Sequence, residues 1–426
     1  MTRAGFVVFV AAVAAAGAPT LVGAQRVPPP SAVGTAASRA AQAPAPSVPA
    51  GRGAGAVPGA SGTTVSPAAV QAAIDKLASF DFKTRTDASR TVRRASAAVA
   101  VPALERAVRS QTADEYVRFR AAVLLADFGD AAGPVLRDMI GDKNDRVRAV
   151  AYQWFERHPS PDVLPALLAA LPGERSEFVR PALTRALAAY GNDPRVQQAL
   201  PPLVERGEDL FRGALIEALG DYRATYALDD LTKVARIEGP LQDDAVTAIG
   251  ELGDPSARPL LAELQKSGPR ELQPTISAAS CLVGIDCAAQ QKYIQDALTF
   301  AVRGGADDAL LRGAVHALGV LALHGHEDAL NSLFDAGIGA QDPVQSAVTL
   351  GIGTVALRSP LTLFHVLERR TDQDAALSLV LDAFDMLSED FDEEQFYVAI
   401  RSQYWAAAEG STERRTAERL IQKLEF

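Results

Sequence analysis

The chain has 426 residues and a formal net charge of −10, with 48% hydrophobic residues and only 6% aromatic ones. The negative charge argues against nucleic-acid binding, because contacts with phosphates need a basic face. The apolar residues are mostly Ala, Leu and Val, which favours helices packed on helices over a β-sheet, because Ala and Leu are strong helix formers.

The first 24 residues have the pattern of a signal peptide. Met1-Thr2-Arg3 gives a short positive start, an apolar run covers residues 4–18, and Val22-Gly23-Ala24 places small residues at a cleavage position. We therefore expect a mature chain that begins at Gln25 and is periplasmic or secreted. The alternative is an uncleaved membrane anchor, although the apolar run is short for a bilayer crossing.

Residues 25–66 are rich in Pro, Ala, Gly and Ser and carry little charge. They show no apolar periodicity, and the repeated prolines forbid a regular helix. This composition predicts a disordered linker that is extended where Pro dominates.

Two short markers then recur with a spacing of about 30 residues, which indicates a stacked repeat. A Gly-Asp turn occurs at Gly129-Asp130, Gly220-Asp221 and Gly253-Asp254. A Pro-x-Leu opening recurs at Pro102, Pro134, Pro165, Pro201 and Pro259. Gly at the end of a helix can take a left-handed conformation, and Pro is tolerated in the first turn of the next helix. Each repeat is therefore predicted to be a pair of antiparallel helices.

The apolar spacing predicts ten such pairs and a charged final helix at 411–424. The pairs are expected at 67–109, 113–141, 145–171, 176–206, 209–237, 241–267, 270–302, 305–336, 341–369 and 372–405. Several first helices open with an apolar residue followed by Arg, as at Arg118, Arg148, Arg180, Arg212 and Arg312. Each Arg either reaches an acidic turn of a neighbouring repeat, with Asp130, Asp142, Asp145 and Asp221 as candidate partners, or is a solvated charge worth little.

The Val-Arg, Gly-Asp and Pro-x-Leu pattern resembles HEAT repeats, specifically the short bacterial type found in phycobilisome-lyase-like (PBS-lyase-like) proteins. The resemblance implies an α-solenoid of the armadillo type, and it implies no particular activity. It is good through residue 268 and weakens beyond. We therefore divide the chain into a regular HEAT array at 67–269, divergent helical repeats at 270–410 and a C-terminal capping helix at 411–426.

Cys281 and Cys287 are the only cysteines, and an oxidising compartment would permit a disulfide between them. The alternative is two buried thiols that act as small apolar residues. Their spacing matches neither a zinc site nor a Cys-x-x-Cys redox motif. His324-x-His326 could bind a divalent metal if carboxylates converged on it. A solvated turn between two helices is the favoured interpretation, and no metal site is predicted.

No motif for nucleophilic, phosphoryl-transfer or zinc-hydrolase chemistry occurs, so we predict neither catalysis nor a cofactor. The acidic run at 389–394 is interpreted as a solvated turn between two helices. The aromatic residues near it are expected to form the core of the last helix pair. Tyr404 and Trp405 would anchor a partner if they are exposed.

These observations favour an exported, non-enzymatic scaffold whose curved inner face binds another protein or a peptide in the cell envelope. The inner face is expected to be lined by the second helix of each pair. Its candidate contacts are Arg106, Arg109, Arg137, Glu205, Arg206, Lys233, Arg236 and Lys266, with Tyr404 and Trp405 as further candidates. Two alternatives remain: a lyase-like or other enzyme on the same scaffold, and a structural envelope component anchored by an uncleaved N-terminal helix.

Overall fold

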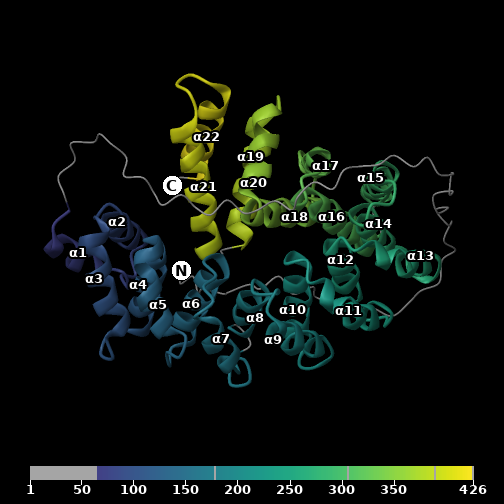
Figure 1. The fold of residues 1–426 in the computed structure, drawn as a ribbon. Coiled ribbons are helices and arrows are strands. Elements are labelled where there is room, and N and C mark those ends of the chain that lie inside the picture. Colours follow the sequence, from purple (N-terminus) through teal and green to yellow (C-terminus); the bar gives the residue numbers. More distant parts are fainter. Residues whose placement is uncertain (1–64, 177–178, 305–306, 388–389, 425–426) are drawn as a thin grey trace. The chain divides into compact units, whose positions relative to one another are not determined.

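Helices account for the regular structure of this chain. The computed structural model describes residues 65–176, 179–304, 307–387 and 390–424 (Figure 1). Over these ranges it contains α-helices and short 3-10 helices but no strand, so the predicted all-α fold is confirmed. The predicted signal peptide at 1–24 lies outside the described residues, and so does the predicted linker apart from its last two residues.

Two compact units make up the described chain, and the first unit extends to Val196. Its 3-10 helix η1 covers Gly129–Ala132. Its α-helices are α1 (Pro67–Ile74), α2 (Phe82–Arg93), α3 (Ala97–Arg109), α4 (Glu115–Ala126), α5 (Gly133–Met139), α6 (Asp145–Arg157), α7 (Leu164–Ala170) and α8 (Arg180–Ala188). Helix α9 (Pro194–Ala199) spans the division between the units. The boundaries expected at 269 and 410 stay predictions.

The second unit begins at Gln197 and carries the remaining helices. Its 3-10 helices are η2 (Pro201–Glu205), η3 (Thr225–Ala227), η4 (Pro255–Ala257) and η5 (Arg270–Leu272). Its α-helices are α10 (Asp209–Asp221), α11 (Leu228–Ala235), α12 (Gln242–Leu252), α13 (Arg258–Ser267), α14 (Gln273–Leu282), α15 (Cys287–Gly304), α16 (Asp308–Leu323), α17 (Glu327–Gly337), α18 (Val344–Arg358), α19 (Pro360–Arg369), α20 (Gln373–Leu387), α21 (Asp390–Ala406) and α22 (Thr412–Leu424).

The helix-pair pattern agrees closely with the sequence prediction, with three local corrections. The segment 67–109 forms three helices instead of two, because Asp81 caps a separate helix α2 by accepting the Thr84 N–H at 2.8 Å. Pro102 lies inside α3 and does not open a helix. Helix α21 begins at Asp390, so most of the acidic run predicted as a turn is helical, in keeping with the preference for negative charge at a helix N-terminus.

The Gly-Asp markers do not all have the predicted role. Gly253 ends α12 in the left-handed region with φ +67°, as expected of a helix-ending glycine. Gly220, in contrast, lies within α10, and Arg223 takes the left-handed conformation three residues later. A Cβ at position 220 would lie 2.8 Å from Ala248 Cα of α12. Gly220 is therefore needed for the close approach of two helices and not for a turn.

The first unit joins its repeats through a buried ladder of Arg and acidic residues. Arg118 donates from Nε to the Val108 carbonyl at 2.8 Å and pairs with Asp142 at 2.5 Å, and its side chain is 2% exposed. Arg148 donates to the Asp142 carbonyl and to both carboxylate oxygens of Glu174, at 2.7 and 2.9 Å. Each Arg thus contacts the end of the preceding repeat and an acid in the turn between its own repeat and the next. We call such a connection between successive repeats a junction. Of the predicted partners, Asp142 is correct.

Beyond Arg212, the second unit uses Gln at three equivalent junctions. Arg212 still donates to the Val204 carbonyl at 2.7 Å. At the next junctions Gln242 donates to the Ala235 carbonyl and Gln273 to the Gly268 carbonyl, both at 3.0 Å. Gln373 donates in the same way to the Leu367 carbonyl at 2.8 Å. The Arg position of the repeat thus becomes Gln, and the hydrogen bond to the preceding helix is kept.

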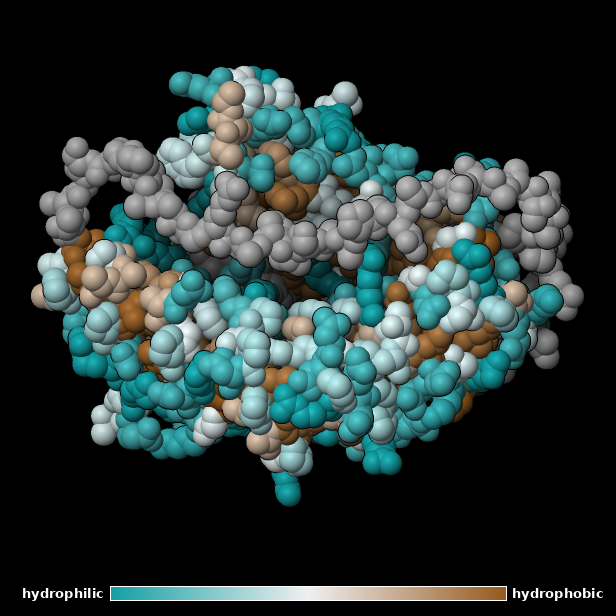
Figure 2. Space-filling view, viewed as in Figure 1, coloured by the Kyte–Doolittle hydropathy of each residue, from teal (hydrophilic) through white to brown (hydrophobic). Residues whose placement is uncertain are grey.

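A continuous apolar core runs through the second unit, from Ala278 of α14 to Leu420 of α22. Phe384 and Phe396 pack in it with ring centroids 4.8 Å apart, as expected for the aromatic residues of the last pair. Hydrophilic side chains cover most of the face shown in Figure 2, with smaller apolar patches among them. Among the described helices none can cross a membrane alone, although the pair α18 and α19, bent by 116°, passes the length and composition test together.

Candidate functional site

The first helices of the second unit bring polar side chains together from distant parts of the chain. Arg358 of α18 donates to Glu217 of α10 at 2.8 Å and also pairs with Asp221 of α10. Thr247 of α12 lies 3.0 Å from His316 Nε2 of α16. In Figure 1, α10, α12, α14, α16 and α18 follow the inside of an arc, and α11, α13, α15 and α17 lie outside them. First helices therefore line the inner side of this unit.

In this unit, the arrangement contradicts the prediction that second helices line the inner face. The reason is the small spacing between first helices. Gly220 and Gly250 let α10, α12 and α14 approach so closely that a Cβ at position 250 would lie 2.5 Å from Ala279 Cα. Helices with a short separation occupy the short inner arc, and the second helices occupy the longer outer one. The apolar periodicity of the sequence shows which residues are buried. It does not show which of the two rows of helices, first or second, is more tightly spaced.

We define the inner cluster as the following seven polar residues: Glu217, Asp221, Asp243, Asp244, Thr247, His316 and Arg358. Its four carboxylates face one guanidinium and one imidazole, so the cluster is acidic. Asp243 and His316 are 3.7 Å apart and about 40% exposed, at 40% and 41%. Burial and the neighbouring Asp243 raise the pKa of Asp244 to about 6, while His316 opposes that shift. The cluster thus combines solvent-accessible negative charge with a carboxyl group that titrates near neutrality.

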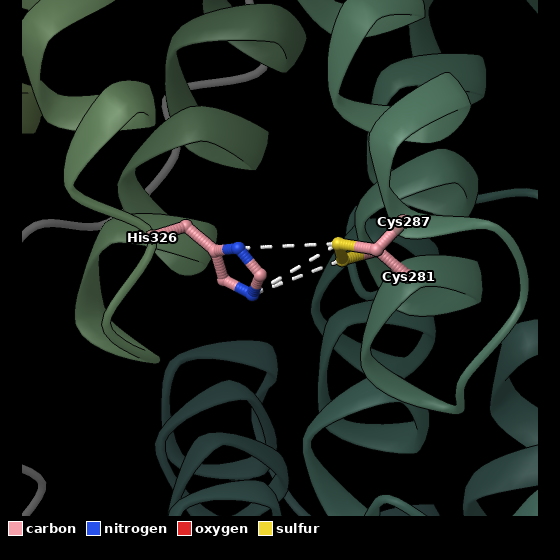
Figure 3. A group of neighbouring side chains, drawn as sticks. All are labelled: Cys281, Cys287 and His326. Carbon is pink, nitrogen blue, oxygen red and sulfur yellow. Dashed lines mark hydrogen bonds between the residues drawn. A yellow bond between two sulfur atoms is a disulfide. The ribbon is translucent and has the colours of Figure 1, made fainter. Parts of the chain in front are cut away.

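The two histidines of the His-x-His turn face different surroundings. His324 Nδ1 lies 3.0 Å from the Val320 carbonyl, and burial lowers the pKa of this histidine. His326 instead faces Cys281 and Cys287, with its ring nitrogens 3.9 Å from the sulfur atoms (Figure 3). The two rings do not converge, and neither is fully exposed, so this turn is not simply solvated. The two cysteines form a disulfide in this structure.

Four of the predicted basic contacts pair with acids of a neighbouring repeat. Each pair links successive second-helix segments: Arg109 with Asp138, Arg137 with Asp162, Lys233 with Glu205, and Arg236 with Glu263. Arg106, Arg206 and Lys266 are exposed. The predicted basic surface is therefore a row of largely balanced charges. Exposed pairs of this kind contribute little to stability.

The C-terminal aromatic residues differ in exposure. Trp405 is 69% exposed, and its ring meets that of Tyr404 edge to face at a centroid distance of 5.0 Å. The guanidinium of Arg414 lies 4.5 Å from the centre of the Tyr404 ring. Trp405 is thus the available anchor of the two, and its partner-binding role stays a prediction.

Sequence reasoning missed most of the inner cluster. It treated Asp221 as a turn residue and did not single out Asp243, Asp244 or Arg358. A usable signal was present: Glu217 and Asp221 are four residues apart, and so are Asp243 and Thr247. Residues four apart share one face of a helix. A polar face on helices that are otherwise apolar and tightly packed marks a surface turned away from the core.

Comparison with known families supports the repeat assignment. A family model for HEAT repeats matches residues 70–156 and 134–220, and one for PBS lyase HEAT-like repeats matches residues 241–267. The chain is a HEAT-repeat protein. No curated protein sequence matches it.

Several solved structures resemble parts of the chain. Human deoxyhypusine hydroxylase in complex with glycerol is 17% identical with a TM-score of 0.25, and the match covers 51% of this chain and 96% of that one. The complex of CpcE and CpcF of phycocyanin lyase from Nostoc sp. is 18% identical with a TM-score of 0.24, covering 78% and 98%. Importin beta is 12% identical with a TM-score of 0.36, covering 83% of this chain and 61% of the importin. Likenesses this distant carry no functional argument.

Proposed function

We propose that this HEAT-repeat protein is a non-catalytic scaffold that binds a basic segment of another protein or a peptide at its inner cluster. One observation supports the proposal above the others: side chains from α10, α12, α16 and α18 gather on one face of the second unit. Repeat proteins use extended surfaces built from successive repeats to bind partners. Here that surface carries four carboxylates, which fits Lys and Arg side chains.

The exposed charges are suited to recognition. The Glu217 side chain is 48% exposed and the Asp243 side chain 40% exposed, so both remain accessible to a partner. Complementary charge across an interface raises association rates and selects partners more than it raises affinity. We therefore expect binding that weakens as salt concentration rises.

The experiment compares matched charge reversals in the full-length chain. Glu217→Lys with Asp243→Lys reverses the inner cluster, and Glu263→Lys with Asp296→Lys reverses two acids on the outer helices α13 and α15. Cross-linked partners from an envelope extract are identified by mass spectrometry, and purified partner is titrated against each variant. Loss of binding by the inner variant alone supports the proposal. Equal binding by both variants, with unchanged helical circular dichroism, overturns it.

We also propose that the scaffold works outside the cytoplasm. The support is the signal-peptide pattern of residues 1–24. N-terminal sequencing of the protein isolated from its host tests this proposal. A chain that begins at Gln25 supports export with cleavage, and a chain that keeps Met1 or Thr2 in the membrane fraction favours the anchored envelope component.

An enzyme built on this scaffold is the second candidate function, and one observation favours it. Asp244, with its pKa raised to about 6, lies beside Asp243 and near His316, and groups with such pKa values can exchange protons near neutral pH. Under the scaffold proposal, Asp244→Asn removes one of four carboxylates and only weakens partner binding. A turnover reaction that Asp244→Asn abolishes would replace the scaffold by the enzyme.

A further inference from the structure

Three metal-binding side chains meet where three helix ends come together in the second unit. Cys281 lies near the end of α14, Cys287 is the first residue of α15, and His326 directly precedes α17. One donor atom from each lies within 4.8 Å of the others. Figure 3 shows the imidazole of His326 facing both sulfur atoms across a short gap. The cluster shares no residue with the inner cluster and has no part in the proposed scaffold function.

We propose that the reduced form of this cluster is a binding site for a zinc-type divalent cation. Cys281, Cys287 and His326 supply two thiolates and one imidazole, which is a ligand set that zinc prefers. Three protein ligands leave the fourth tetrahedral position for water or for a group of a partner. The disulfide and the bound cation are alternative states of the same sulfur atoms, so the site exists only when the disulfide is open.

The surrounding backbone places Cys287 and His326 independently of the disulfide. The His326 N–H donates to the Leu321 carbonyl at 3.1 Å, and the preceding Gly325 has φ +89°, which fixes the turn that carries the imidazole. Asp286 takes φ +24° before α15, and its carboxylate accepts the Ala289 N–H at 3.3 Å. When the disulfide opens, Cys287 and His326 therefore stay in place, because backbone contacts fix the starts of α15 and α17. Ligands held by their own backbone lose little freedom when a metal binds.

The site is exposed enough for the disulfide form and the cation-bound form to interconvert. Cys281 is buried at 6% exposure, whereas Cys287 and His326 are partly exposed. A reductant or a cation can therefore approach from the side of Cys287 and His326. The buried sulfur of Cys281 lies on the inner side of the site, away from solvent. The sequence spacing hid this site, because the third ligand follows Cys287 only after 39 positions.

The conversion balances with a dithiol as the reductant. The dithiol gives two electrons and two protons to the disulfide, the S–S bond breaks, two thiols form, and the reductant becomes a disulfide. A divalent cation then displaces the two thiol protons and accepts a lone pair from the neutral imidazole. Oxidation by another disulfide re-forms the Cys281–Cys287 bond and releases the cation.

The test titrates the full-length protein with Co²⁺ and Zn²⁺ in both redox states. The reduced protein, freed of reductant under anaerobic conditions, should bind one equivalent of Co²⁺ with thiolate-to-metal charge-transfer absorption, and Zn²⁺ should displace it. The oxidised protein should bind neither ion at this site. His326→Ala should weaken binding by about tenfold or more, and the matched variant His324→Ala, in the same turn, should leave it unchanged.

The proposal is overturned by equal affinity in the oxidised protein, by no loss of affinity in His326→Ala, or by a loss in His324→Ala as large as in His326→Ala. Helical circular dichroism of each variant is measured first. If His326→Ala does not fold, His326→Gln replaces it, because it keeps the length of the side chain and removes the imidazole. Retained charge-transfer absorption in a Cys281→Ser, Cys287→Ser double variant would equally exclude the site.

Discussion

The two units of this protein close the same repeat junction with different chemistry. In the first unit, Arg118 and Arg148 donate to the preceding helix end and also pair with acids of the next junction. In the second unit beyond Arg212, Gln242 and Gln273 make the bond to the preceding helix end with a neutral amide. The backbone geometry needs a hydrogen-bond donor at this position. It does not need a charge.

The difference has an energetic consequence. A buried guanidinium requires a carboxylate partner, because removing either member leaves an uncompensated charge out of water. A buried amide requires only its hydrogen bond. The first unit therefore couples successive junctions electrostatically, since Asp142 pairs with Arg118 through its carboxylate and accepts from Arg148 through its carbonyl. The second unit couples its repeats mainly by packing, through approaches such as Gly250 against Ala279.

The largest expected effect comes from breaking the charged ladder. Arg118→Ala should lower the stability of the first unit by about 3–5 kcal/mol, because Asp142 is left buried and without its cation. Amide hydrogen exchange resolved by segment measures the two units separately, and the loss should be confined to residues before Val196. The matched control is Arg109→Ala, whose pair with Asp138 is exposed and should contribute about 1 kcal/mol or less.

A double variant sharpens the same test by giving the first unit the chemistry of the second. Arg118→Gln with Asp142→Asn keeps a donor for the Val108 carbonyl and removes both charges. It should be more stable than Arg118→Ala alone. If the double variant is no better, the first unit depends on the charges themselves and the proposed equivalence of the two junctions fails.

The neutral junction should be less sensitive. Gln242→Ala removes the donor to the Ala235 carbonyl, which is buried, and should cost the second unit about 1–3 kcal/mol. Gln422→Ala on α22 is the control, because its bond to Glu418 is exposed. Hydrogen exchange of the amides in α11 and α12 measures this loss of stability. A loss as large as that of Arg118→Ala would break the distinction between the two kinds of junction.

Much of this architecture could be predicted from the sequence, because helix pairing depends on local signals. Apolar spacing, Pro134 at the start of α5 and Gly253 at the end of α12 act within a few residues. The ladder partner Asp142 was likewise within reach of the repeat period. The equivalence of Gln242 to Arg212 does not follow from the apolar-Arg pattern, although the 30-residue step between them continues it, because that pattern specifies Arg and Gln supplies the same donor.

The inner cluster and the cysteine–histidine cluster could not be predicted in the same way. The cysteine–histidine cluster joins two successive repeats, with Cys287 and His326 39 residues apart. The inner cluster depends on contacts between repeats that are not neighbours, such as Arg358 with Glu217, which are 141 residues apart. Such contacts follow from the curvature of the helix stack. Curvature arises from close helix approaches, as at Gly220 and Gly250, that recur along one row of helices. A pattern of apolar and polar positions does not show how closely the helices of one row approach each other.

The smallest expected effect is an opposite response of the two units to pH. Burial alone would raise the pKa of Glu174, but hydrogen bonds from Arg148 and the Ser176 N–H outweigh it and hold the pKa below its ordinary value of 4.5. The folded first unit therefore binds this proton less readily than the unfolded chain. Its stability should fall as pH drops below about 4.5. Glu174→Gln should flatten that decline.

Asp244 gives the stability of the second unit the opposite dependence on pH. Its pKa is raised from 3.8 to about 6, chiefly by burial and by Asp243, so the folded unit binds this proton more readily than the unfolded chain does. The contribution is fully present below pH 3.8 and is lost as pH rises to about 6. Hydrogen exchange at pH 6.5, 5 and 4, corrected for intrinsic exchange rates, should show α12 becoming more protected on acidification while α6 does not. Asp244→Asn should remove the gain in α12, and a gain that survives this substitution would assign the pH response to another group.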